Sequence, residues 1–101
     1  MLKAATLDEV KSGKFKPITH QGKALLLCNV DGEYYAVDNL CSHEDFPLSY
    51  GCLKGHSIEC SLHGACFDVR TGEPTHEPAE LAIKTYPVSI HDHDVYIEIE
   101  E

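Results

Sequence analysis

The sequence predicts a small all-β protein, a sandwich or barrel of antiparallel sheets with a metal-binding subdomain inserted into it. Both ends of the chain consist of short apolar or alternating segments separated by turn signals. The middle, residues 40–80, is richer in Gly, Pro, His and Cys than its flanks. We therefore expect one domain over residues 1–101. Its β scaffold comprises residues 1–39 and 81–101, and residues 40–80 form the inserted subdomain.

A first hairpin is predicted between residues 24 and 39. The segments ALLLCNV (24–30) and EYYAVDN (33–39) flank Asp31-Gly32. An Asp-Gly pair between two apolar runs favours a two-residue type I′ turn, which needs a positive φ at both positions. We therefore expect these two segments to pair as antiparallel strands.

A second hairpin is predicted from residues 81–90 and 94–100, closed by a turn at 91–93. In the latter segment Val95, Ile97 and Ile99 alternate with polar residues, so that one face should point into the core. Pro87 has no N–H to donate and is expected at an edge or a bulge.

Shorter elements are expected elsewhere. Short strands are expected at 57–60 and 65–69, with a turn at Thr71-Gly72. The only helix candidate is a single turn within residues 6–13, where Thr6 is followed three residues later by Glu9.

Composition limits the classes of partner. The chain has 101 residues and a net charge of −9, which disfavours nucleic acid and anionic membranes as partners. No stretch approaches the roughly 18 apolar residues of a membrane span, and no signal peptide is recognisable, so that we expect a cytoplasmic protein. Five cysteines in such a chain make a disulfide framework unexpected and metal ligation the better interpretation.

Two motifs carry the candidate metal ligands. Cys41-x-His43 and Cys60-x-x-His63 are separated by 16 residues. A zinc finger groups like ligands together, whereas each motif here offers one Cys and one His. That arrangement suits a dinuclear centre with two thiolates on one iron and two imidazoles on the other. Zinc remains the alternative.

This C-x-H…C-x-x-H pattern resembles the Rieske family, and Gly64, Phe67-Asp68 and Thr71-Gly72 extend the match. The resemblance implies one [2Fe–2S] cluster. It also implies its ligands: Cys41 and Cys60 on the inner iron, His43 and His63 on the outer iron. Pro78 would lie in the loop that covers the cluster.

The resemblance narrows to one branch of the family. Quinol-oxidising members have two further cysteines where this chain has Phe46 and Leu62, and hydroxyl donors where it has Ala65 and Phe67. Without those donors the reduction potential should fall at the low end of the Rieske range of roughly −150 to +300 mV. This combination resembles the ferredoxins of aromatic-ring oxygenases.

The implied function is one-electron transfer from a flavin-dependent reductase to a non-haem iron oxygenase, by a monomer that is not itself an enzyme and has no catalytic residues. The length leaves no room for an oxygenase catalytic domain. The alternative is a Rieske-like small subunit of a larger reductase such as nitrite reductase.

Other reactive residues have simpler interpretations. Cys28 lies in an apolar run and is expected to be a buried core residue. Cys52 and Cys66 are interpreted as spare thiols, and the 91–94 stretch HDHD as a solvated turn. Glu44 and Asp45 are expected to form an acidic rim near His43.

Overall fold

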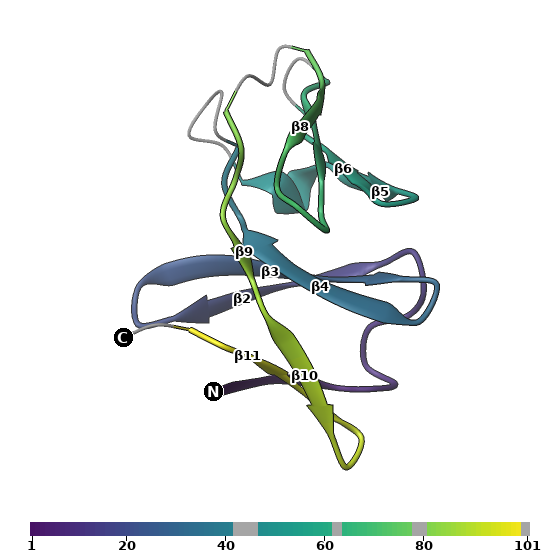
Figure 1. The fold of residues 1–101 in the computed structure, drawn as a ribbon, viewed down its shortest axis with the longest axis vertical. Coiled ribbons are helices and arrows are strands. Elements are labelled where there is room, and N and C mark those ends of the chain that lie inside the picture. Colours follow the sequence, from purple (N-terminus) through teal and green to yellow (C-terminus); the bar gives the residue numbers. More distant parts are fainter. Residues whose placement is uncertain (42–46, 62–63, 78–80, 100–101) are drawn as a thin grey trace.

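The computed structural model describes residues 1–41, 47–61, 64–77 and 81–99. Within these ranges the chain forms three antiparallel sheets, stacked as an upper, a middle and a lower layer in Figure 1. The all-β prediction is confirmed. The only helical element in the described ranges is a short 3-10 helix, η1 (Leu48–Tyr50). No helix of the described residues is long and apolar enough to cross a lipid bilayer.

The middle sheet has four strands in the order β2-β3-β4-β9. Their bounds are β2 (Phe15–His20), β3 (Lys23–Val30), β4 (Glu33–Asp38) and β9 (Thr85–Tyr86). Asp31 and Gly32 have φ angles of 51° and 89°, so the predicted turn between β3 and β4 is confirmed.

Strand β3 is buried on both faces, which explains its unbroken apolar sequence. Leu25 and Leu27 belong to the core shared with the lower sheet. Leu26 and Cys28 belong to the core shared with the upper sheet. The prediction that Cys28 is a buried core residue is therefore confirmed.

The lower sheet has the order β1-β11-β10. Its strands are β1 (Leu2–Thr6), β10 (Val88–His91) and β11 (Asp94–Ile97). Val95 and Ile97 are fully buried while Tyr96 is half-buried, as the alternation predicted. Strand β1 was not predicted from the sequence. Residues 7–10 form a turn rather than a helix, in which a Glu9 carboxylate oxygen accepts the Thr6 N–H at 3.3 Å.

The prediction of one continuous strand over residues 81–90 is wrong. The segment divides at Pro87: β9 joins the middle sheet and β10 the lower sheet, while residues 81–84 belong to no strand. Pro87 cannot donate to a ladder, and its carbonyl accepts the Glu98 N–H at 2.9 Å. The chain therefore changes sheets at the proline. The following strand also ends earlier than predicted, at Ile97.

The upper sheet has the order β5-β6-β7-β8 and is inserted between β4 and β9. Its strands are β5 (Cys52–Lys54), β6 (Ser57–Glu59), β7 (Cys66–Asp68) and β8 (Pro74–His76). Strands β6 and β7 confirm the short strands predicted at 57–60 and 65–69. In Figure 1 this sheet lies above the middle sheet.

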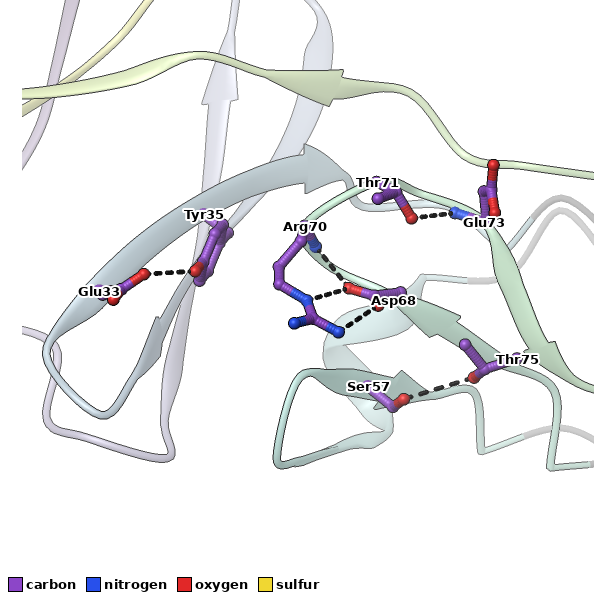
Figure 2. Close-up of polar contacts among 8 residues, drawn as sticks. All are labelled: Glu33, Tyr35, Ser57, Asp68, Arg70, Thr71, Glu73 and Thr75. Carbon is purple, nitrogen blue, oxygen red and sulfur yellow. Dashed lines mark hydrogen bonds and ion pairs between the residues drawn. The ribbon is translucent and has the colours of Figure 1, made fainter.

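A tight turn after β7 fastens the upper sheet to the returning chain. Asp68 accepts three hydrogen bonds from Arg70, one from its backbone and two from its guanidinium, at 2.8–3.1 Å (Figure 2). The Gly72 N–H then donates to the Asp68 carbonyl at 2.7 Å, and the Gly72 carbonyl accepts the Ile83 N–H at 2.8 Å. The predicted Thr71-Gly72 turn is thus confirmed, and it holds residues 81–84 in place.

Replacing Gly72 by Ala should destabilise this attachment. Gly72 has a φ of 81°, and a Cβ there would lie 2.0 Å from the Ile83 carbonyl oxygen. Gly13 is a matched control because its φ is also 81° and nothing lies within 4 Å of its Cβ position. We expect Gly13→Ala to cost about 1 kcal/mol of unfolding free energy and Gly72→Ala about 2–4 kcal/mol. Equal shifts in thermal unfolding midpoint would contradict the close contact.

Candidate metal centre

The two predicted cysteine ligands reach the same apolar core from different loops. Cys41 lies three residues after β4, and Cys60 directly follows β6; each is 1% exposed. Both belong to the hydrophobic cluster that includes Leu48 and Phe67. His43 and His63, the predicted imidazole ligands, lie outside the described residues.

The second loop is closed by a short backbone hydrogen bond. The Cys60 N–H donates to the Ala65 carbonyl at 2.7 Å, and Gly64 has a φ of 73°. Glycine favours this left-handed conformation because it has no Cβ. The chain can therefore reverse within residues 60–65, directly between β6 and β7, and hold the Cys60 thiol inward.

The first loop is held by Asn39, a residue that the sequence analysis did not single out. Its side chain accepts the Ser49 N–H at 2.9 Å and donates to the Ser49 hydroxyl at 3.2 Å. Its backbone N–H donates to the Ala24 carbonyl at 3.0 Å. Asn39 is 8% exposed, so it ties η1 to the end of β4 across the segment that contains Cys41.

Gly51 allows the two loops to approach each other. A Cβ at this position would lie 1.7 Å from the Glu59 carbonyl oxygen. The backbone that leaves η1 therefore packs against the backbone that precedes Cys60. This close approach is possible only without a side chain at residue 51.

The remaining thiols do not form a pair. Cys52, Glu59 and Cys66 are successive cross-strand neighbours on β5, β6 and β7. The two cysteines are thus two strand spacings apart, about 10 Å, which is too far for a disulfide. Both thiols face the Glu59 carboxylate, at 3.7 and 3.9 Å. Burial, and secondarily the charge of Glu59, raises the pKa of the Cys66 thiol.

Cys28 lies on neither ligand loop. It lies within β3, and burial alone raises the pKa of its thiol to about 12. A thiol in this state is a poor nucleophile and a poor metal ligand. Cys28 therefore has a packing role.

The described part of the site fits a thiolate-bound metal centre. Two buried cysteines from separate loops share one apolar cluster, where an unbound thiolate would be poorly solvated. Metal ligands must be deprotonated, and a metal ion compensates the charge of the thiolates it binds.

Similarity to known proteins decides the family. Residues 1–87 match the family described as Rieske [2Fe-2S] domain. The chain belongs to the Rieske [2Fe-2S] family. Its cofactor is therefore a Rieske [2Fe–2S] cluster, and zinc is disfavoured.

Similar proteins align with almost the whole length of this chain. It is 43% identical, over 97% of its length and 94% of the relative's, to the naphthalene 1,2-dioxygenase system ferredoxin component of Pseudomonas putida. It also matches the structure of the ferredoxin of carbazole 1,9a-dioxygenase from Nocardioides aromaticivorans IC177. That match has a TM-score of 0.94 and 33% identity, and it covers 98% and 97% of the two chains.

A second similar structure contains two proteins. It is a complex of reduced oxygenase and oxidised ferredoxin in carbazole 1,9a-dioxygenase. The matched chain has a TM-score of 0.93 and 30% identity, covering 96% of the present chain and 100% of the other. The predicted Rieske fold is confirmed by these structures.

The two positions that lack a hydroxyl donor lie in the same apolar cluster as the two cysteines. Ala65 and Phe67 are fully buried and belong to the same cluster as Cys41 and Cys60. An alanine methyl and a phenyl ring cannot donate a hydrogen bond to a sulfur atom. This region of the Rieske domain is accordingly apolar. Pro78, which was predicted to lie in the loop that covers the cluster, lies outside the described residues.

Asn39→Ala should loosen the first loop. It removes both side-chain hydrogen bonds to Ser49 and leaves the Ser49 N–H unpaired, at a cost of about 1–3 kcal/mol. We expect a chelator to remove iron from the loaded variant about tenfold faster than from the loaded wild type. The loss of iron is measured as the decrease in visible absorbance. Asn39→Asp keeps an oxygen acceptor and should have a smaller effect. An unchanged rate of iron loss for Asn39→Ala would show that the hydrogen bonds between Asn39 and Ser49 do not protect the centre.

Proposed function

We propose that this chain is the ferredoxin component of an aromatic-ring oxygenase system, a one-electron carrier rather than an enzyme. The observation that carries the proposal is its similarity, over nearly its full length, to the naphthalene dioxygenase ferredoxin. Cys41 and Cys60, which reach one apolar cluster from separate loops, support it.

Cys41, His43, Cys60 and His63 are the proposed ligands of the cluster. The cluster supplies reversible one-electron chemistry when it is bound. The described residues provide its setting: Leu48 and Phe67 exclude water, while Asn39 and the Cys60–Ala65 hydrogen bond hold the loops. We propose that the two histidines lie at the surface through which electrons pass.

The proposed partners are a flavin-dependent reductase and a terminal oxygenase. The similar carbazole dioxygenase ferredoxin has been solved in complex with its oxygenase, which supports the second partner. The reductase follows from the chemistry, since a carrier of single electrons needs a donor. We further propose a cytoplasmic monomer, and the unpaired thiols of Cys28, Cys52 and Cys66 favour a reducing compartment.

The alternative, a small subunit of a larger reductase such as nitrite reductase, is less well supported. The relatives described above are ferredoxin components or ferredoxins of dioxygenases. Stable co-purification with one large reductase would favour the alternative. Weak, salt-sensitive association with an oxygenase would favour the carrier.

His63→Ala tests the ligand assignment and the function together. We expect loss of the visible absorbance and the electron paramagnetic resonance signal of the cluster. Electron delivery should be lost with them, measured as product formation in a panel that includes naphthalene and biphenyl dioxygenase oxygenases with a flavin reductase. His76→Ala is the matched control because His76 is exposed on β8. A fully active His63→Ala protein would overturn the assignment, and failure of the wild type with every oxygenase would overturn the function.

Ala65→Ser tests why the potential should be low. A hydroxyl at this buried position could donate to the reduced centre, and a hydrogen bond to a charged acceptor is worth about 1.5–3 kcal/mol. We expect film voltammetry to show a wave on the order of 50–100 mV higher than that of the wild type. Ala36→Ser is a control in the other core, and it should leave the potential unchanged. A wild-type wave at the high end of the Rieske range would contradict the low-potential prediction.

A further inference from the structure

An open groove lies where β4 leaves the middle sheet for the first ligand loop. It has a volume of about 360 Å³, and its lining includes Lys23, Asp38, Leu40, Lys84 and Tyr86. Leu40 directly precedes Cys41 and is 44% exposed. The groove is therefore adjacent in the chain to a proposed cluster ligand.

Two lysines converge on one aromatic ring in this groove. The Nζ atoms of Lys23 and Lys84 lie 5.5 and 5.2 Å from the centroid of the Tyr86 ring. Because both distances run to the same point, the two ammonium groups are within about 11 Å of each other. Each makes a cation–π contact, which holds the charge without neutralising it.

The aromatic ring that both lysines contact is fixed in place. Tyr86 is 6% exposed and donates its hydroxyl to the Asp38 carboxylate at 2.5 Å. Burial, the hydrogen bond and the charge of Asp38 together raise the pKa of Tyr86, so the ring stays neutral at physiological pH. With two ammonium groups and one carboxylate, the groove has a net charge of +1.

This positive groove contrasts with the rest of the molecule, whose net charge is −9. Four other basic side chains are neutralised by acidic neighbours in ion pairs: Lys3–Asp94, Lys16–Glu9, Lys54–Glu59 and Arg70–Asp68. Within the described ranges, neither Lys23 nor Lys84 lies in an ion pair. An unneutralised cationic pair is complementary to an anion.

We propose that Lys23 and Lys84 bind a carboxylate side chain of the terminal oxygenase, with Leu40 in apolar contact beside it. This inference rests on the proposed function and adds the chemistry of the docking contact. A mostly acidic ferredoxin surface facing a basic partner has many nearly equivalent orientations. A single contact of opposite polarity, with the positive charge on the ferredoxin and the negative charge on the oxygenase, would select one of these orientations. Complementary charge patterns set the register of a complex.

The test compares two charge reversals. Lys23→Glu/Lys84→Glu and Lys11→Glu/Lys14→Glu each change the net charge from −9 to −13, since every substitution adds two negative charges. Lys11 and Lys14 are exposed and lie before β2, at the other end of the middle sheet (Figure 1). The assay uses the cluster-loaded chain with an oxygenase that accepts electrons from the wild type. Lys23→Arg/Lys84→Arg tests rescue.

For the groove variant we expect the KM for ferredoxin to rise about tenfold at low ionic strength, with kcat within twofold of the wild type. The control pair should change KM less than threefold, and the arginine variant should resemble the wild type. At 0.5 M NaCl the difference between the two reversals should fall below twofold, because salt screens the contact. In both charge-reversal variants the visible absorbance and the reduction potential should equal those of the wild type.

Equal KM changes in the two reversals would overturn the inference, since only net charge would then matter. So would a larger effect on reduction by the flavin reductase than on the oxygenase step, because the groove would then serve the other partner. A fall in kcat together with a shifted potential would also overturn it. Failure of the wild type with every oxygenase would instead overturn the proposed function itself.

Discussion

The upper sheet depends on the middle sheet for its hydrophobic core. Its strands have only three residues each, too few to bury an apolar face by themselves. Ile58 and Phe67 pack in one cluster with Leu26 and Val37 of the middle sheet. Cys41 and Cys60 belong to that same cluster. The burial that stabilises the upper sheet is therefore also the burial that surrounds the proposed cysteine ligands.

Local hydrogen bonds and close backbone contacts hold the ligand loops in place, in addition to the packing of the core. Asn39 spans the first loop, and the Cys60–Ala65 bond closes the second. Gly51 and Gly72 allow backbone approaches that a side chain would prevent. These four features lie around the ligand loops and at the return of the chain to the scaffold. A redox centre whose surroundings are held in this way needs little rearrangement when its charge changes.

Charge is distributed unevenly on this acidic protein. Four of the eight basic side chains pair with acidic neighbours, whereas Lys23 and Lys84, beside Tyr86, lie in no ion pair within the described ranges. The proposed cysteine ligands lie among apolar residues, including Ala65 and Phe67. Apolar surroundings without donors favour a low potential, and the exposed charges around them favour particular partners. The two properties are therefore set by different residues.

The sequence by itself determined the β class, the Asp31-Gly32 and Thr71-Gly72 turns and the resemblance to the family, because Asp31-Gly32 favours a particular backbone and the Cys/His spacing matches the Rieske pattern. These are local signals. Only the tertiary structure decided that the chain changes sheets at Pro87, and that Asn39 and Ser49 pair across a loop. It alone brought Lys23 and Lys84 to one ring, although 60 residues separate them. Each of these depends on long-range packing, which no local pattern encodes.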